Sequence, residues 1–564
     1  MAPLLATGER PPTASSITYG TESTTAQDTA MVVEPLRRHL SLFDLVAIGI
    51  GITVGSGLFV LCGFVAKHYA GPATSLSWLI GGVTACLSGS AYAELSARVP
   101  AAGSAYAYAF VAIGELPALL AAACLSVEYL VAPAAVARSW GSKVVIYLTA
   151  TFNTNNSTGE TVADWFQPSA ALLGFSPLGA LITTICTGIL LAGVRESKMV
   201  TNVVTITKVS VVLYMVFVGF FFVTASNWEP FIPPEFGVAG VFRGATASFL
   251  GYIGYDEIAC LAGEAKNPKR NLPLATMITL GSITILYTLS ALSLTGMQPF
   301  NSISAVSGFP AAFRYNDATF SAQLTALGEL ATLPVVVLLA IMAQPRLQHA
   351  LAEDGLIPAW FGVQTAEGNL WNGTVFAGGV TCLAASFIPF HLLSAMISSA
   401  VLVSLSITDT SLILLWHESP ESNPILGDVI MLSYQGACLV TGLALTHFID
   451  STIGRIVAAI GAILMLGCVV TLVRRCPKSD VFGGRRRRYA KDSIHQEEDG
   501  YFRTPFVPYL PCVAIFVNWY LLSQLHLEGI LLTLAFLGLT CVYYYTYAIH
   551  RSVGNTGVWD MPHH

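Results

Sequence analysis

Apolar stretches of about 20 residues recur along the chain between residues 41 and 550, and only short polar segments interrupt them. A helix needs a stretch of that length to cross a hydrocarbon core about 30 Å thick. Hydrophobic residues make up 54% of the 564 residues and charged residues only 11%, whereas a soluble domain carries roughly 25% charged residues. The sequence therefore predicts one large, all-helical membrane domain.

Composition and missing motifs exclude several other classes of protein. A net charge of -6 leaves no basic surface for nucleic acid. The 11 cysteines are scattered through the apolar stretches without metal-ligand spacing, so we expect them to pack as small apolar side chains. The sequence has no phosphate-binding loop and no catalytic elbow, which argues against ATP drive, an enzyme, a metal site or a cofactor.

The apolar pattern divides the chain into fourteen predicted spans. They lie near residues 41–66, 74–97, 116–149, 170–193, 200–225, 241–262, 273–297, 322–352, 373–392, 394–416, 428–449, 453–473, 506–524 and 528–549. The third and eighth are longer than a straight crossing requires, so we expect them to tilt or to extend beyond the membrane.

The basic residues of the short loops predict the orientation, because they favour the cytosolic side. The largest group lies in the loop of residues 474–503. We therefore expect a disordered cytosolic tail over residues 1–40 and, since the number of spans is even, a cytosolic tail over residues 550–564. The opposite side would carry overlapping glycosylation sequons at Asn155 and Asn156.

Two spans contain glycines where a continuous helix would avoid them. Residues 49–57 include four glycines, each costing a helix roughly 1 kcal/mol relative to alanine. Residues 249–257 include two glycines among aromatic residues, followed by two carboxylates. Unwound backbone at membrane depth requires a protein-lined or water-filled cavity. Such breaks in two corresponding spans indicate the binding site of a transporter.

The broken ends suit a small zwitterion. Free N–H groups at a helix amino end attract a carboxylate, and freed carbonyls accept from an ammonium group. An amino acid carries both groups. The alternative is that these glycines are helix-packing contacts, which are common between membrane helices. Two breaks five helices apart favour the binding site, because an inverted repeat predicts that spacing.

Charged side chains inside spans are further candidates, because burying one costs at least roughly 2.5 kcal/mol. Glu128, Lys208 and Asp409 lie inside predicted spans, and Asp256 and Glu257 follow the second break. Lys208 alternatively snorkels to the interface. Asp256 and Glu257 are candidates for a gate or for a structural charge pair.

Several motifs carry a resemblance to a known family. They occupy residues 51–59, 91–95, 99–106, 249–256, 263–268, 344–346, 352–356 and 504–511. Over residues 38–550 the chain resembles the cationic amino acid transporter family, within the amino acid–polyamine–organocation superfamily. The resemblance implies a LeuT-like fold with a five-helix repeat over residues 41–225 and an inverted second repeat over residues 241–416. Four peripheral helices would follow over residues 428–549.

The resemblance also implies where the substrate lies. Its carboxylate would meet the amides of Gly55, Ser56 and Gly57, close to Thr53. Its ammonium would meet backbone carbonyls beside the second break, and the candidates there are Phe249, Gly251, Tyr252, Ile253 and Gly254.

Three side chains are implied to set the specificity and the driving force. Lys208 matches a lysine of proton-coupled relatives, which favours proton symport. Ala340 stands where relatives with cationic substrates keep a small residue, and Glu128 would complement the charge of the substrate. The implied activity is secondary transport of arginine, lysine or ornithine by alternating access, in the plasma membrane.

Some features depart from the family pattern and leave alternatives open. Residues 264–265 are Glu-Ala rather than the common Glu-Glu, and valines fill residues 335–337. A broad or neutral amino acid permease, a polyamine transporter and a non-transporting amino acid sensor therefore remain alternatives. The loop after the third span has no cysteine, so we expect no disulfide-linked heavy chain. The partners expected are the amino acid and membrane lipid.

Overall fold

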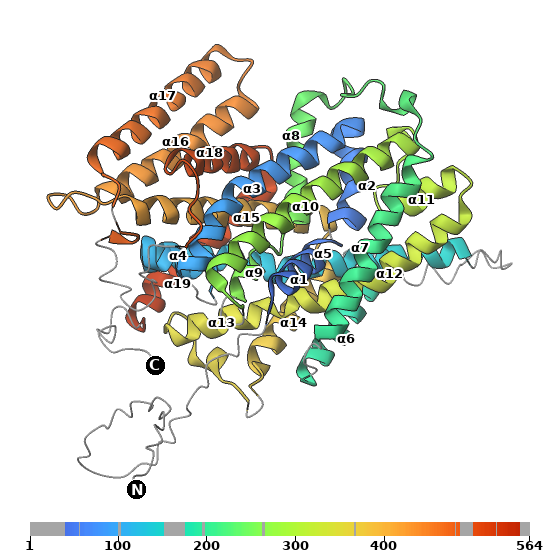
Figure 1. Ribbon diagram of the computed structural model, residues 1–564, viewed down its shortest axis with the longest axis horizontal. Helices are drawn as coiled ribbons and strands as arrows, with labels where there is room; N and C mark the ends of the chain where they lie inside the picture. Colours follow the sequence, from blue (N-terminus) through green and yellow to red (C-terminus); the bar gives the residue numbers. More distant parts are fainter. Residues whose placement is uncertain are drawn as a thin grey trace, which may run out of the picture. The chain divides into compact units, whose positions relative to one another are not determined.

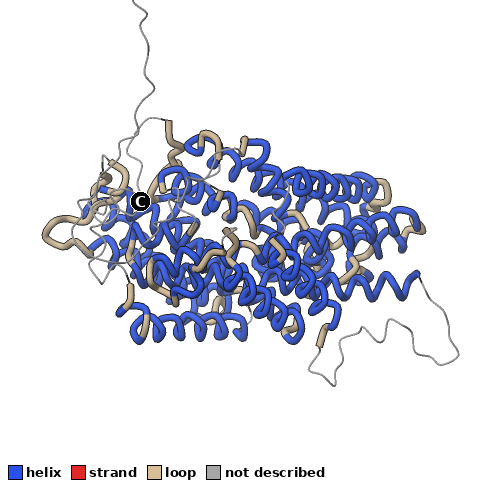
Figure 2. Tube along the Cα trace, turned by 90° about the horizontal axis from the view of Figure 1, so that it is seen from below, coloured by secondary structure: helices blue, strands red, loops and turns tan. Residues whose placement is uncertain are grey.

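The structure is a computed structural model. It describes residues 40–55, 57–99, 103–151, 175–193, 198–261, 265–365, 368–479, 481–484, 500–525 and 527–552. Over these residues the chain is helical, with no strand and two isolated bridges, Leu40 with Ala265 and His417 with Lys478 (Figure 2). Ser56, Asn155 and Asn156 lie outside the described residues, as do nearly all of both predicted tails and residues 485–499 of the basic loop.

Eight helical segments of the described chain are long and apolar enough to cross a membrane. They are Leu42–Arg98, Glu115–Ala150, Pro268–Met297, Thr319–Glu353, Phe390–Trp416, Leu426–His447, Thr452–Arg475 and Glu528–His550. Three shorter apolar helices are Pro177–Leu191, Thr205–Phe220 and Tyr509–Ser523. The first of the eight segments combines several helices, because the chain leaves helical geometry inside it.

The amino-terminal helices begin with a strong cap. Ser41 and Asp44 form a capping box, in which each side chain accepts from the backbone N–H of the other. The helices that follow are α1 (Leu42–Thr53), α2 (Cys62–Val65), α3 (Thr74–Arg98), α4 (Ala105–Ala112), α5 (Glu115–Thr151), α6 (Pro177–Leu191) and α7 (Lys198–Phe220). A π-helical segment, η1 (Gly57–Leu61), leads into α2.

The middle of the chain repeats the alternation of short and long helices. Its helices are α8 (Gly237–Ser248), α9 (Glu257–Cys260), α10 (Pro268–Met297), α11 (Gly308–Tyr315), α12 (Thr319–Ile341), α13 (Ala343–Glu353), α14 (Trp371–Phe387) and α15 (Phe390–Trp416). A 3-10 turn, η7 (Phe249–Tyr252), follows α8 directly. The eighth predicted span is thus two helices, α12 and α13, which meet at Met342.

Two long helices organise the packing. α3 lies along α10 and α8, while α5 contacts α15, α12, α6 and α14. The last helices are α16 (Leu426–His447), α17 (Thr452–Arg475), α18 (Tyr509–Ser523) and α19 (Leu527–Thr546). Figure 1 shows α16 and α17 side by side at the edge of the helices, where α17 packs mainly on α16.

Two buried polar clusters join the last helices to α3 and α15. In the first, the Glu94 carboxylate accepts from Arg98 Nε at 3.1 Å, from Trp416 Nε1 at 3.0 Å and from the backbone N–H of Thr504 at 2.7 Å. In the second, Ser88 Oγ donates to Asp409 at 2.8 Å, and the Asn518 amide contacts both. Because charge-assisted bonds in a low dielectric are strong, these clusters fix α18 and the segment before it.

Candidate functional site

The first helix is interrupted at the predicted glycines. α1 ends at Thr53, Val54 is extended, and Gly55 has a φ of 147°. Only glycine adopts such a φ without strain. Helical geometry resumes at Gly57, and the first turn of a helix leaves N–H groups without intrahelical partners. Of the three residues predicted to hold a carboxylate, Gly55 and Gly57 are described and Ser56 is not.

The second break has a matching geometry. α8 ends at Ser248 and tightens into η7, and the chain is extended at Ile253. Gly254 then has a φ of 107°. α9 starts only at Glu257, so the carbonyls between these helices are released from regular helical pairing.

The two breaks touch each other through glycine. A Cβ placed on Gly57 would lie 2.6 Å from the Cα of Gly251, and one placed on Gly251 would lie 2.8 Å from the Cα of Gly57. A Cβ on Gly254 would lie 2.6 Å from Ile52 and 3.2 Å from the hydroxyl of Thr53. No side chain fits between the broken helices, so their backbones are in direct contact.

Aromatic side chains of neighbouring helices support this contact. Tyr287 on α10 donates its hydroxyl proton to the carbonyl of Thr53 at 2.9 Å, at the end of α1. Tyr252 donates to the carbonyl of Trp78 on α3 at 2.6 Å. The Trp78 and Tyr287 ring centroids are 4.6 Å apart. These bonds hold the broken ends of both helices against α3 and α10.

A small cavity lies beside the second break. Its lining combines four of the predicted site residues, Glu128, Phe249, Tyr252 and Ile253, with Asp256 and with Tyr92, Tyr255, Val401, Ser404 and Leu405. The space open to the centre of a water molecule is ≈ 10 Å³, roughly enough for one water. An amino acid therefore does not fit into the cavity in this conformation.

The cavity is acidic. Glu128 and Asp256 are both buried, and Asp256 and Glu257 lie close enough to Glu128 to interact with it electrostatically. Tyr129 donates its hydroxyl proton to Asp256 at 2.6 Å, and no described residue donates a hydrogen bond to Glu128. Because a nearby positive charge favours the ionised form of a carboxyl group, two buried carboxyl groups without a lining cation suit a positively charged group.

Several predicted residues lie outside the lining of this cavity, among them Lys208 and Ala340. Lys208 on α7 is buried, and its ammonium donates to the carbonyl of Gly51 at 2.5 Å. The same ammonium would lie 3.7 Å from a Cβ on Gly55, so it reaches the end of α1. Ala340 is one helical turn beyond Val336, whose side chain would lie 2.9 Å from that Cβ.

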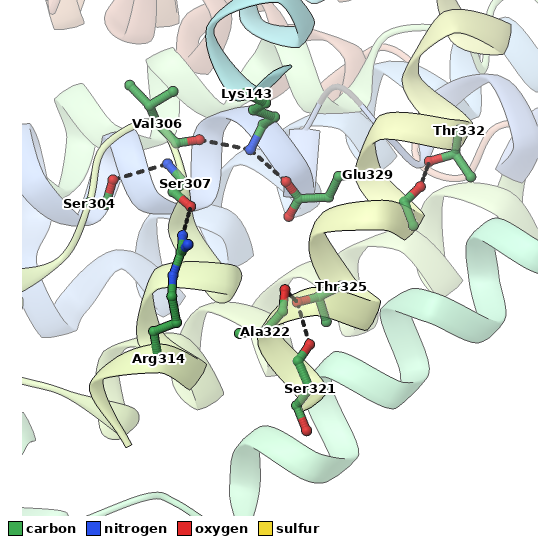
Figure 3. A network of polar contacts seen from close by, with 11 residues as sticks. Lys143, Ser304, Val306, Ser307, Arg314, Ser321, Ala322, Thr325, Glu329 and Thr332 are labelled. Carbon is green, nitrogen blue, oxygen red and sulfur yellow. Dashed lines mark hydrogen bonds and ion pairs between the residues drawn. The ribbon is translucent and has the colours of Figure 1, made fainter. Parts of the chain in front are cut away.

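The sequence analysis missed a buried ion pair. It joins α5, which carries Glu128, to α12, which carries Ala340. Lys143 on α5 and Glu329 on α12 are 2.7 Å apart, with side chains 4% and 3% exposed. The Lys143 ammonium also donates to the carbonyl of Val306 at 2.7 Å, which ties the segment before α11 to both helices (Figure 3). Both residues lie within predicted spans, so the rule that selected Glu128 applies to them too. Among the described residues no group of acidic, histidine or cysteine side chains is suited to a metal ion.

Comparisons with known proteins identify the family of this chain. The amino acid permease family model matches residues 40–473, and the model for the C-terminus of these permeases matches residues 502–552. The chloroplastic cationic amino acid transporter 9 of Arabidopsis thaliana is 30% identical over 511 residues, which cover 88% of this chain and 85% of the relative. The chain belongs to the cationic amino acid transporter family of amino acid permeases. It is therefore an integral membrane amino acid transporter and not an enzyme.

Two other relatives show the breadth of similar proteins. The human cationic amino acid transporter 4 is 35% identical over 400 residues, covering 69% of this chain and 62% of the relative. The methylthioribose transporter of Bacillus subtilis is 33% identical over 391 residues, covering 68% of this chain and 83% of the relative. The transporters similar to this chain thus include proteins named for chemically different substrates.

The glycine contact leads to a prediction about stability. Gly57→Ala and Gly251→Ala should each destabilise the protein by about 1–3 kcal/mol, because an added methyl overpacks the contact between the breaks. The measurement is the thermal unfolding of the purified protein in detergent. Gly281→Ala is the matched control, since a Cβ there meets nothing within 4 Å. Equal melting temperatures for all three variants would contradict the role of the contact.

Proposed function

We propose that this permease is a secondary active transporter of cationic amino acids such as arginine, lysine and ornithine. Transport would proceed by alternating access. The acidic cavity beside the second break is the observation that carries this proposal. The carboxyl groups of Glu128 and Asp256 line it, and Glu257 lies close enough to interact with Glu128 electrostatically. No lysine or arginine is among the cavity's lining residues. A cationic side chain would stabilise the ionised form of these carboxyl groups, whereas a neutral side chain would give no such stabilisation.

The same proposal includes the fold of the family. Fourteen helices would cross the membrane, with an inverted pair of five-helix repeats over residues 41–225 and 241–416 and four peripheral helices after them. Support comes from α1 and α8, the opening helices of the two repeats, because each is followed by a break containing a glycine with positive φ. Both termini would be cytosolic, and the plasma membrane is the proposed location. Relatives in Arabidopsis thaliana carry names for the vacuole, the mitochondrion and the chloroplast.

Recognition of the backbone of the amino acid would use both breaks. The carboxylate would bind the amides of Gly55, Ser56 and Gly57, and the ammonium would bind carbonyls of residues 249–253. Because Gly57 and Gly251 are in contact, the substrate must separate the breaks to enter. The described conformation would then be a closed state of the transport cycle, and separation of the breaks would form the open site.

Lys208 would link a proton to this movement. Its charged ammonium stabilises the free carbonyl of Gly51 at the end of α1. Loss of the proton would weaken that bond, since a charge-assisted hydrogen bond is about twice as strong as a neutral one. The protonation state of Lys208 would therefore bias the position of α1, and a proton gradient would drive accumulation.

Uptake into proteoliposomes tests the proposed function. The purified transporter should accumulate labelled arginine, and an inward proton gradient should increase the accumulation. Excess lysine and ornithine should compete with arginine, whereas putrescine and methylthioribose should not. Failure to take up arginine, alanine or any other amino acid would refute transport of this class. Efficient competition by putrescine would instead favour a polyamine transporter.

Lys208 supplies a separate prediction about coupling. Lys208→Ala should abolish gradient-driven accumulation while arginine still exchanges across the membrane without a gradient. Lys208→Arg should also lose gradient-driven accumulation, because the guanidinium keeps its proton. The measurement is the ratio of internal to external arginine at steady state with and without the gradient. Gradient-driven accumulation by either variant would show that this lysine does not carry the coupling proton.

Glu128 supplies a prediction about selectivity. Glu128→Gln should raise the KM for arginine by at least about tenfold, which corresponds to roughly 1.4 kcal/mol of lost interaction. The KM for alanine should change little, because alanine has no side-chain charge, so alanine uptake is the internal control. The two KM values are measured on the same proteoliposomes. An equal rise for both amino acids would assign Glu128 a purely structural role.

A further inference from the structure

A second concave site lies far along the chain from the broken helices, between α16, α17 and α18. Its volume is ≈ 800 Å³, within the range of about 300–1,000 Å³ that is typical of small-molecule pockets. Apolar side chains line most of it, among them Leu445, Met465, Val469 and Phe516. We call this site the peripheral groove.

The peripheral groove is hollow because α17 presents small side chains to it. Ala458, Ala459 and Ala462 form part of the wall, where larger residues would fill the space. The other faces of α17 expose Ile453 and Ile463 by 75% and 69%. An apolar helix with so much exposed surface faces the hydrocarbon of the bilayer, so the groove opens to acyl chains rather than to water.

One end of the peripheral groove carries a positive charge. Arg474 lines the groove in the last turn of α17, and Tyr509 lines it at the start of α18. Both side chains are exposed. Arg474 forms no ion pair with the described carboxylates. A basic side chain at the end of a span attracts an acidic lipid headgroup.

The dimensions of the peripheral groove match the position of a lipid. Ala458 and Arg474 are separated by about 24 Å along the axis of α17, at 1.5 Å per residue. The groove thus extends from the end of the span well past the middle of a hydrocarbon core about 30 Å thick. A chain lying along it would bury its methylenes against α17 and α18 while its headgroup stayed at Arg474.

We propose that the peripheral groove binds one phospholipid with an acidic headgroup, with an acyl chain along the groove and the phosphate at Arg474. Tyr509 adds a hydroxyl donor at the same end. The charge of Arg474 selects this occupant over a zwitterionic lipid. It also selects this occupant over an apolar helix of a second copy, which would leave the guanidinium without a counter-ion.

Native mass spectrometry of the full-length transporter, released from nanodiscs of equal phosphatidylglycerol and phosphatidylcholine, tests this proposal. The wild type should retain phosphatidylglycerol in preference. Arg474→Gln should reduce that retention about fivefold, the factor expected for roughly 1 kcal/mol per basic residue near the membrane surface. Arg475→Gln is the matched control, because Arg475 is the adjacent residue, is also exposed and does not line the groove. Its retention should equal that of the wild type.

A second variant separates the groove from surface charge. Ala462→Trp fills the groove without changing the charge, and it should also abolish the preference for phosphatidylglycerol while the melting temperature in detergent stays within the wild-type range. An equal loss in Arg474→Gln and Arg475→Gln would reduce the effect to general surface charge and overturn the proposal. Displacement of the bound lipid by inorganic phosphate alone, or a dimer in place of a bound lipid, would overturn it as well. If Ala462→Trp unfolds the protein, Ala459→Leu serves as the milder filling variant.

Discussion

The contact between Gly57 and Gly251 is the constraint on which the rest of the site depends. Two helices are broken where they meet, and their backbones approach until no side chain separates them. Backbone groups released by a break have no water to pair with inside a bilayer. The backbone groups of each break therefore need hydrogen-bond partners from neighbouring helices. Tyr287 and Lys208 are two such partners, because both donate hydrogen bonds to carbonyls of α1. The geometry of the cavity follows from that mutual support.

The position of both breaks was predictable from the sequence, because glycines in a membrane helix locally disfavour helical geometry. The same is true of the acidic side chain at Glu128, which is conspicuous inside an apolar stretch. The glycine pattern did not reveal that Gly57 faces Gly251, since pairing across the fold is a tertiary property. Tyr287 and Trp78 were also hidden, because an aromatic residue in an apolar span looks like ordinary core. The hydrogen bond from Tyr287 to the Thr53 carbonyl and the ring contact of Tyr287 with Trp78 become visible only once the neighbouring helices are placed.

The buried ion pair on α5 and α12 was not predicted for a different reason. Lys143 and Glu329 are 186 positions apart, and each lies within a long, mainly apolar stretch. Their charges were visible, but their pairing required knowledge that α5 and α12 lie together. The long spans likewise did not show that α5 is one continuous helix with Pro133 inside it, whereas α12 and α13 are separate. Proline and glycine bias a helix, and tertiary packing decides whether it bends or ends.

Buried polar contacts hold some helices of this protein together, whereas the two broken helices meet without them. α5 and α12 share a buried ion pair, and α3, α15 and α18 share the clusters around Glu94 and Asp409. Separating those helices would leave charges or acceptors unpaired in a low dielectric, which is costly. Separating Gly57 from Gly251 leaves no charge or acceptor unpaired between them, since their contact consists of backbone packing alone. The proposed alternating access would open and close the site at every cycle, and the contact between the two glycines is where the helices would separate at the lowest cost.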